Sequence, residues 1–397
     1  MDRRDFLMAA GSAAVTGLAG TRSASAFSIS MGPIYQPFPY GVVIPSNSVN
    51  NGFFVCQFGP NNQYHFRHCG FDGRPDTSEV SLPNLGSQPE VRARPDGSVI
   101  VHFRDSNHYL RCSAMNPQGQ LVADGVQLSA KPMIYDSWTF GSAKMVSLDA
   151  MHSLAMWNFP TTSGMAVFGT VVDNNGSPVG PLGRKIFDTS TGGWTGFVTA
   201  TADFYPTGAA VFFQRTSRTT GWLSTSARFI DQTGKTNSPS LLVTDKLLAS
   251  FSRFFDPAFG AQGGSAVVAS RGLLQNGTRG FDIVRIWRNG AKRLLKRINI
   301  KAQTIDPNQA IALLGNGIVI ATYFDKASST DNYGYLYLDA MTQQGQSLIS
   351  RKPIAKVNNV SDEHCSLIRN TTQSGALVLW GVPSDYLYSA RQISVGT

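Results

Sequence analysis

Two short segments of the sequence contain paired groups that could transfer protons. Asp105 and His108 stand three residues apart, and Tyr333 follows Asp325 after eight. Carboxylate, imidazole and phenol groups are the usual agents of general acid–base catalysis. Either pair predicts catalysis only if the fold brings both members to one site, because each is also an ordinary composition for a surface loop.

Other residues suit ligand binding rather than catalysis. Trp rings offer flat apolar faces to a sugar, and a guanidinium offers a planar fork to a carboxylate or sulfate. The candidate binding residues of these two types are Arg104, Trp138, Trp194, Arg215 and Arg271.

The sequence contains no pattern typical of a metal or cofactor site. The two histidines of His65-x-x-His68 would point to opposite faces of a strand. Cys-x-x-Cys, nucleophile-elbow, phosphate-loop and calcium-loop patterns are absent. We therefore expect neither a metal nor a cofactor.

The elements that must position these residues come from an internal repeat. A small residue opens a short apolar run seven times, at intervals of 45 to 58 residues. The runs begin at Gly52, Gly97, His152, Gly208, Gly264, Gly317 and Gly375.

Each copy contains further short strands and a turn with Gly, such as Asp173–Gly176 or Asp231–Gly234. A four-stranded sheet with two apolar faces cannot stand alone, whereas radial stacking buries both faces. The pattern predicts an all-β fold, a seven-bladed β-propeller of four-stranded blades, in a single domain over residues 27–397. A two-domain β protein with accidental periodicity is the alternative.

The last unit lacks its outermost strand. An apolar stretch at residues 27–35 precedes the first unit and has no partner there. We expect this stretch to complete the last blade and close the ring.

The repeat, Gly-x-x-Val-Val followed by an aromatic strand and Asp-x-x-Gly, resembles that of bacterial exported β-propellers. The resemblance implies an architecture rather than a chemistry. By analogy it places a site at one mouth of the central channel, in the loops that join the second strand to the third and one blade to the next.

Residues 1–26 are predicted to be an export signal. Paired Arg3 and Arg4 precede an apolar run that ends in the small-residue site Ala24-Ser25-Ala26. The pattern resembles the bacterial twin-arginine signal and implies export of a folded protein, periplasmic or secreted. No later stretch is long and apolar enough for a transmembrane segment.

The formal net charge is +9, but cations are dense only at residues 285–297. A nucleic-acid binder would show clustered Lys and Arg, so we predict no nucleic-acid partner. We interpret the basic run as the solvated edge of a hairpin. A glycan or an envelope protein is the predicted partner, and the protein is expected to be a monomer.

Four cysteines in an exported chain could form disulfides. Cys56 and Cys69 fall on neighbouring strands of one predicted hairpin, close enough to be bridged. Cys69 with Cys112, on equivalent strands of adjacent blades, is the alternative.

The predicted function is recognition of an envelope protein or glycan at one mouth of the propeller. The alternative is a carbohydrate-active enzyme, a lyase or glycoside hydrolase that acts on an acidic glycan. An enzyme would bring titratable groups with perturbed pKa values together in one site.

Overall fold

The computed structural model describes most of the chain after residue 27. The described residues are 28–38, 43–49, 52–58, 64–70, 74–75, 79–82, 87–94, 98–133, 143–162, 164–189, 194–203, 208–217, 219–220, 222–236, 239–248, 258–262, 265–273, 279–301, 309–314, 316–326, 328, 333–358, 364–369, 375–382 and 387–396. The predicted export signal, residues 1–26, lies outside them.

The described ranges contain strands and no helix, so no helix there could cross a membrane. Three four-stranded sheets come first in the chain. They consist of β2 (Val43–Val49), β3 (Gly52–Phe58), β4 (Tyr64–Gly70) and β5 (Val80–Leu82); β6 (Ser87–Ala93), β7 (Val99–Arg104), β8 (Leu110–Met115) and β9 (Leu121–Gln127); and β10 (Lys144–Ser147), β11 (Ser153–Thr161), β12 (Gly164–Val172) and β13 (Arg184–Asp188).

An eight-stranded sheet follows, and two four-stranded sheets complete the described chain. The eight strands are β14 (Trp194–Asp203), β15 (Ala209–Ser217), β16 (Trp222–Ile230), β17 (Leu241–Leu248), β18 (Ala258–Gln262), β19 (Ser265–Leu273), β20 (Arg279–Trp287) and β21 (Lys292–Ile300). The last two sheets are β22 (Gln309–Leu313), β23 (Ile318–Lys326), β24 (Gly334–Thr342) and β25 (Ser347–Val357); and β26 (His364–Arg369), β27 (Gly375–Val382), β28 (Leu387–Gly396) and β1 (Ser28–Phe38).

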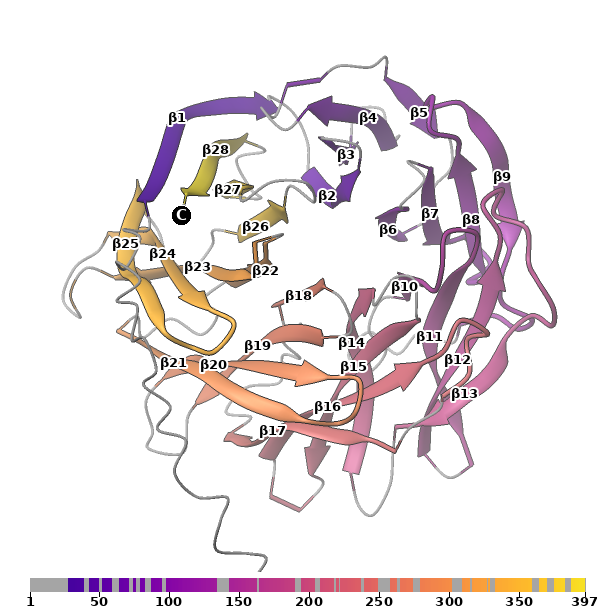
Figure 1. The fold of residues 1–397 in the computed structure, drawn as a ribbon. Coiled ribbons are helices and arrows are strands. Elements are labelled where there is room, and N and C mark those ends of the chain that lie inside the picture. Colours follow the sequence, from indigo (N-terminus) through magenta and orange to yellow (C-terminus); the bar gives the residue numbers. More distant parts are fainter. Residues whose placement is uncertain are drawn as a thin grey trace, which may run out of the picture.

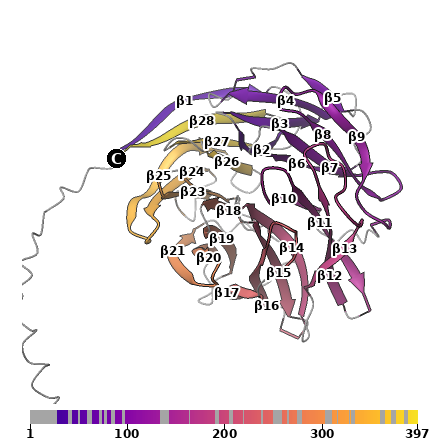
Figure 2. The ribbon, with the colours of Figure 1, turned by 45° about the vertical axis from the view of Figure 1, so that its right-hand side comes forward.

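The sheets stand around a common centre, as in a β-propeller (Figures 1 and 2). The first strand of each four-stranded unit, such as β6 or β22, lies nearest the centre, and the fourth, such as β9 or β25, lies at the rim. All strand pairs are antiparallel, as expected for strands joined by short turns. The predicted all-β fold and propeller architecture are thus observed.

The first and last described strands pair in one sheet. β1 pairs with β28 in antiparallel register from Ser28↔Gly396 to Phe38↔Tyr388. The apolar stretch that precedes the first unit therefore pairs with the last strand of the last unit.

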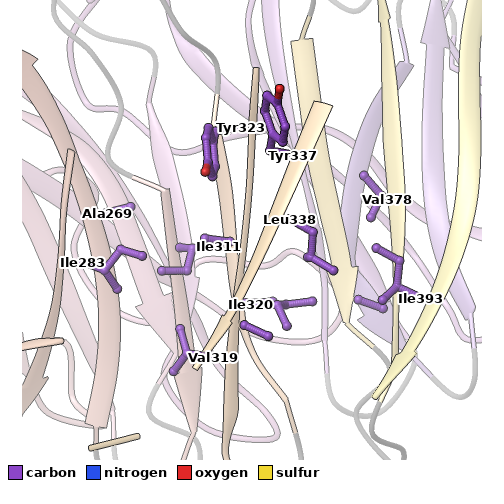
Figure 3. Packing of buried hydrophobic residues seen from close by; sticks show 14 of the residues in the cluster. Ala269, Ile283, Ile311, Val319, Ile320, Tyr323, Tyr337, Leu338, Val378 and Ile393 are labelled. Atoms are coloured by element: carbon purple, nitrogen blue, oxygen red, sulfur yellow. The ribbon is translucent and has the colours of Figure 1, made fainter. Parts of the chain in front are cut away.

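Apolar side chains fill the space between neighbouring sheets. β23 is buried along nearly its whole length, because both faces of its run Ile318–Phe324 meet another sheet. Figure 3 shows side chains of one cluster from three successive sheets, for example Ile283, Ile320 and Val378. This two-sided burial is why the central strands read as continuous apolar runs.

The predicted Gly turns share one geometry. In the turn at Thr342–Gly345, the N–H of Gly345 donates to the carbonyl of Thr342 (2.9 Å), and the turn glycine has φ +87°. The turn before β21 repeats this pattern, with the N–H of Gly290 donating to Trp287 and φ +85° at Gly290.

The register of the first hairpin does not fit the predicted Cys56–Cys69 bridge. Cys56 lies opposite Phe66 and Cys69 opposite Phe53. The cysteines are three ladder positions apart, roughly 10 Å along the strand, beyond the Cα separation that a disulfide spans. The alternative partner, Cys112, is a buried thiol that donates to the carbonyl of Gly176 (3.3 Å).

Candidate functional site

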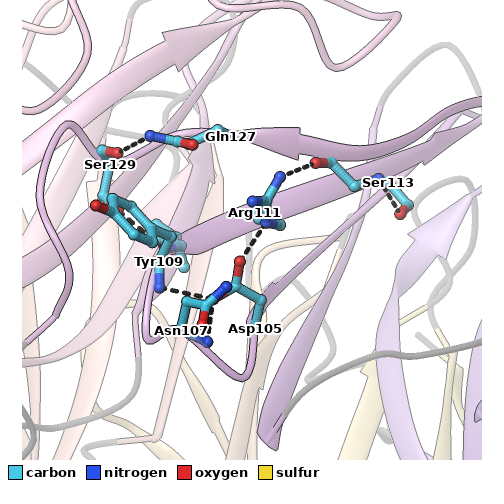
Figure 4. Close-up of polar contacts among 9 residues, drawn as sticks. Asp105, Asn107, Tyr109, Arg111, Ser113, Gln127 and Ser129 are labelled. Atoms are coloured by element: carbon cyan, nitrogen blue, oxygen red, sulfur yellow. Dashed lines mark hydrogen bonds and ion pairs between the residues drawn. The ribbon is translucent and has the colours of Figure 1, made fainter.

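The predicted acid–base loop between β7 and β8 is held by Asp105 (Figure 4). Its Oδ1 accepts hydrogen bonds from the backbone N–H groups of Asn107 and Tyr109, both at 2.9 Å, and Arg111 pairs with Oδ2. Burial alone would raise the pKa of Asp105, but the bonds from Arg111 and Tyr109 outweigh it and hold the pKa below its ordinary value. Asp105 is therefore ionised, and its carboxylate stabilises the turn between β7 and β8.

The backbone N–H of His108 donates to the carbonyl of Asp105 at 3.0 Å, but the described contacts of the Asp105 carboxylate do not include the His108 side chain. His108 is exposed, it adopts φ +66°, and its carbonyl accepts the N–H of Met133 at 2.7 Å. Since the carboxylate of Asp105 serves Arg111 and the loop backbone, these contacts give no support to a proton-transfer pair with His108.

We expect Asp105→Asn to lower the free energy of unfolding by about 1–2 kcal/mol at pH 7, because a charge-assisted bond to Arg111 is lost. A depressed folded-state pKa stabilises the protein above the unfolded value, about pH 4, and this stabilisation disappears as pH falls through the folded pKa. Urea unfolding at pH 7 and at pH 3 should therefore show the gap between wild type and variant closing in acid.

The exposed pair Lys185–Asp188 provides the control. Asp188→Asn should change stability by less than about 0.5 kcal/mol at either pH. An Asp105→Asn deficit of equal size at both pH values would contradict the assigned role.

The second predicted pair, Asp325 and Tyr333, lies in a cluster of aromatic and charged side chains on β23, β24 and β25. Tyr333 immediately precedes β24, and Tyr335 and Tyr337 lie within it. The ring centroids of Tyr333 and Tyr335 are 6.0 Å apart, and those of Tyr335 and Tyr337 are 5.8 Å apart. A cation lies over each outer ring: Lys356 Nζ is 4.2 Å from the Tyr333 centroid, and the Arg351 guanidinium is 4.1 Å from the Tyr337 centroid. We call Asp325, Tyr333, Tyr335, Tyr337, Arg351 and Lys356 the tyrosine cluster.

A buried carboxylate holds the arginine of this cluster. Asp325 is fully buried, and its Oδ2 accepts from Arg351 Nη1 at 2.6 Å. Its Oδ1 accepts the backbone N–H groups of Lys301 (2.9 Å) and Lys326 (2.8 Å). Burial lowers the pKa of Arg351, but the hydrogen bond and charge of Asp325 outweigh it and raise that pKa. The guanidinium therefore stays charged and fixed.

The backbone at Arg351 is unusual as well. Its φ is +52°, one of two positive values at non-glycine residues in the described chain, and its N–H donates to Asp339 Oδ2 at 3.2 Å. A positive φ at a residue with a Cβ is strained and persists where the surroundings enforce it. Here the buried carboxylates Asp325 and Asp339 hold both ends of the residue.

A second buried carboxylate, Asp339, binds a tyrosine and a lysine. The Tyr323 hydroxyl donates to Asp339 Oδ2 at 2.7 Å, and Lys296 of β21 pairs with Asp339 Oδ1. Burial, with the charge of Asp339, raises the pKa of Tyr323 far above its ordinary value. Burial also raises the pKa of Tyr337, so both phenols remain protonated at neutral pH.

Sequence reasoning named Asp325 and Tyr333 but missed their neighbours. Tyr333, Tyr335 and Tyr337 alternate in the sequence at the start of β24, so their side chains share one face. This spacing could have revealed the aromatic row. The lysine and arginine come from β25, and nothing in their local sequence links them to β24.

The cluster lies at the predicted end of its sheet, at the connection between the second and third strands. Asp325 comes from the second strand, β23, whereas Arg351 and Lys356 come from the fourth strand, β25. The site is therefore nearer the rim than the centre (Figure 1).

Of the five predicted binding residues, Trp194, Arg215 and Arg271 belong to the eight-stranded sheet and Arg104 to the sheet of β6–β9. Arg104 ends β7, Arg215 lies in β15, and Arg271 lies in β19. Burial lowers the pKa of Arg215, and the charge of Arg228 lowers it further. Trp194 begins β14, and Trp138 lies outside the described residues. None of these strands belongs to the sheet of the tyrosine cluster.

A further ionisable group, which sequence reasoning did not single out, lies between the second and third sheets. Glu90 and His102 are a cross-strand pair, and Lys144 Nζ lies 3.4 Å from Glu90 Oε2. His102 is 1% exposed and contacts the carbonyl of Ala143 (2.9 Å). Burial lowers the pKa of His102, so it is neutral, and no substrate can reach it.

No metal-binding group emerges from the described ranges, where no three His, Cys, Asp or Glu side chains converge as ligands. At the tyrosine cluster, the partly exposed rings of Tyr333 and Tyr335 instead lie near Lys356 and the fixed guanidinium of Arg351, whereas Tyr337 is buried beneath that guanidinium. Such a surface can stack against a sugar ring and pair with its acidic substituents.

The chain is similar in fold to several solved structures. A polysaccharide lyase, an ulvan lyase bound to -[GlcA(1-4)Rha3S]-, aligns with a TM-score of 0.54 and 10% identity over 91% of this chain and 95% of its own. A prolyl endopeptidase aligns with a TM-score of 0.50 and 13% identity over 88% of this chain and 48% of its own. The β-propeller domain of the Trilobed protease from Pyrococcus furiosus aligns with a TM-score of 0.45 and 9% identity over 90% of this chain and 94% of its own.

No protein-family model matches the sequence, and no curated protein matches it either. At these identities the likeness concerns the fold alone.

Proposed function

We propose that this chain is an exported β-propeller that binds an acidic glycan at the tyrosine cluster. The observation that carries the proposal is the row of three tyrosines at the start of β24 and just before it, with Lys356 and Arg351 over its two ends. Aromatic faces suit the apolar side of a sugar ring, and a fixed guanidinium suits a carboxylate or sulfate.

We further propose that the propeller has seven blades and is closed by β1. In the eight-stranded sheet, β17 joins β19 through the single pair Leu248↔Leu273. Divided there, the sheet becomes two four-stranded blades, β14–β17 and β18–β21, which with the other five sheets make seven. The pairing of β1 with β28 supports the closure.

The export proposal is based on residues 1–26 of the sequence. Cleavage after Ala26 would leave β1 just inside the new N-terminus, since β1 begins at Ser28. The mass and N-terminal sequence of the protein recovered from outside the cytoplasm test this proposal.

Binding is favoured over catalysis by the charges within the cluster. Asp325 is fully occupied in fixing Arg351 and two backbone N–H groups, so it is a poor general base. Tyr337, whose pKa is raised, is protonated and cannot accept a proton at neutral pH. The structural likeness to a lyase bound to an acidic glycan supports the ligand class and makes catalysis the alternative to test.

Calorimetric titration with a tetrasaccharide of the -[GlcA(1-4)Rha3S]- repeat tests the proposal. We expect Tyr335→Ala and Lys356→Gln each to weaken binding about tenfold, the loss from removing one stacking or charge-assisted contact. Lys185→Gln, which removes an equivalent exposed charge on β13, should bind as wild type does.

The same solutions should show no new ultraviolet absorbance. An eliminative lyase would form a C4–C5 double bond in the uronic acid, which absorbs ultraviolet light. A rise in this absorbance would show that the protein is a lyase and would overturn the proposal of a binding protein. Equal affinity in wild type, Tyr335→Ala and Lys356→Gln would remove the tyrosine cluster as the site.

A further inference from the structure

Positive charge is concentrated on two neighbouring rim strands. β21 (KRLLKRINI) and β25 (SLISRKPIAKV) carry seven Lys and Arg residues and no acidic residue. The remaining fourth-position strands, β1, β5, β9, β13 and β17, carry three cations and three acidic residues between them. The basic character therefore belongs to one sector of the rim.

These two strands belong to successive sheets and meet through the side chain of Lys296. Lys296 of β21 lies 3.2 Å from the Ser350 hydroxyl of β25 and pairs with Asp339 of β24. Arg351 and Lys356, which belong to the tyrosine cluster, are on β25. The basic sector, defined as the cations of β21 and β25, is therefore continuous with the proposed glycan site.

Part of this charge has no acidic partner. Arg297 pairs with Asp282 (2.7 Å), and the acidic partners of Lys296 and Arg351 are buried carboxylates. Among the described residues, no ion pair involves the other four cations of the sector. These are Lys292, Arg293, Lys352 and Lys356.

Protection of sheet edges against aggregation is the simplest other explanation, because edge strands often carry Lys. If this were the reason, every rim strand would be expected to carry such cations. β9, however, exposes Leu121 (41%) and Val122 (44%) instead of cations. Edge protection therefore does not explain why only β21 and β25 are basic.

We propose that the basic sector extends the glycan site into a track for a polymer, so that the ligand is an acidic polysaccharide rather than a short oligosaccharide. This inference depends on the proposed function, because it uses the tyrosine cluster as one end of the track. Arg293 is near the start of β21, whereas Lys356 is near the end of β25, so they mark opposite ends of the sector. Lys292 also begins β21, and its Nζ donates to the carbonyl of Leu242 in β17 at 2.7 Å. A polyanion that spans both ends releases several counterions and binds in a salt-dependent manner.

The test compares the -[GlcA(1-4)Rha3S]- polymer with its tetrasaccharide on wild type and on the double variant Lys292→Gln, Arg293→Gln. We expect the variant to bind the polymer about tenfold more weakly at low salt, from two lost exposed charge contacts, with a shallower dependence on salt. Tetrasaccharide affinity should be unchanged, because the tyrosine cluster is intact. The double variant Lys185→Gln, Arg184→Gln on β13 provides the charge-matched control.

Each outcome separates the two proposals. Tetrasaccharide binding with no loss of polymer affinity in the β21 variant overturns the track and leaves the proposed function standing. Failure of wild type to bind either sugar overturns both. Vesicles containing anionic lipid provide a third arm, and binding of vesicles but not of polymer, lost in the β21 variant, would assign the sector to a membrane surface and overturn the polysaccharide track.

Discussion

Asp325→Ala should lower the free energy of unfolding by about 3–5 kcal/mol, the usual effect of removing one partner of a buried ion pair. The variant leaves the Arg351 guanidinium without its carboxylate and leaves two backbone N–H groups, of Lys301 and Lys326, without their acceptor. The loss of these bonds should release the strained backbone at Arg351 as well. Chemical denaturation monitored by Trp fluorescence and circular dichroism measures the change.

The pair Asp282–Arg297 is the control, because its aspartate also binds an arginine but at the surface. Asp282 binds Arg297 through both oxygens, at 2.7 and 2.8 Å, but the arginine is 52% exposed. Asp282→Ala should therefore cost less than about 1 kcal/mol. Similar losses in both variants would mean that Asp325 contributes no more than an exposed carboxylate.

A single methyl group at Gly345 should destabilise the protein by about 3 kcal/mol. The residue has φ +87°, and a Cβ there would lie 2.7 Å from the backbone carbonyl oxygen of Leu295 in β21. Gly345→Ala thus combines an unfavourable backbone conformation with a clash that would push two sheets apart. Thermal unfolding and the denaturant midpoint should both fall.

Gly290 is the control that measures only the cost of placing a residue with a Cβ at a positive φ. It occupies the equivalent turn one unit earlier with φ +85°, but a Cβ there would meet no atom within 4 Å. Gly290→Ala should cost about 1 kcal/mol. The difference between the two variants measures the contact between sheets, and its absence would show that these turns do not hold the sheets at their spacing.

The repeat made much of the architecture predictable because each signal was local. A glycine at the fourth turn position, as at Gly290 and Gly345, fixes a hairpin, and a run such as Ile318–Phe324 indicates burial on both sides. The pairing of residues 28–35 with the last unit could be predicted by counting strands. These signals require no knowledge of which side chains meet across sheets.

The candidate site was only partly predictable, for physical reasons. Arg351 matters because a carboxylate on β23, Asp325, is buried beneath it, and this contact depends on register shifts within the β24–β25 ladder. Such irregularities leave no pattern in the sequence. The Cys56–Cys69 prediction failed similarly, because the centre of the hairpin is displaced and the partner of Cys56 becomes Phe66.

At Asp105 the local sequence does contain a signal, but that signal fits two roles. An aspartate two residues before Asn107, in a loop between two strands, suits a side chain that caps its own turn as well as it suits catalysis. The structure assigns the carboxylate to the turn. Composition alone could not choose between these roles.

The pairing of β1 with β28 also governs the order of events during biosynthesis. Of the described strands, β1 emerges first from the ribosome, and its partner emerges last. Until translation reaches β28, β1 has no native neighbour, and its backbone groups are available to any exposed strand edge nearby. The slowest step of folding should therefore be this long-range annealing, after synthesis is complete, and a chaperone that shields β1 should raise the yield of native protein.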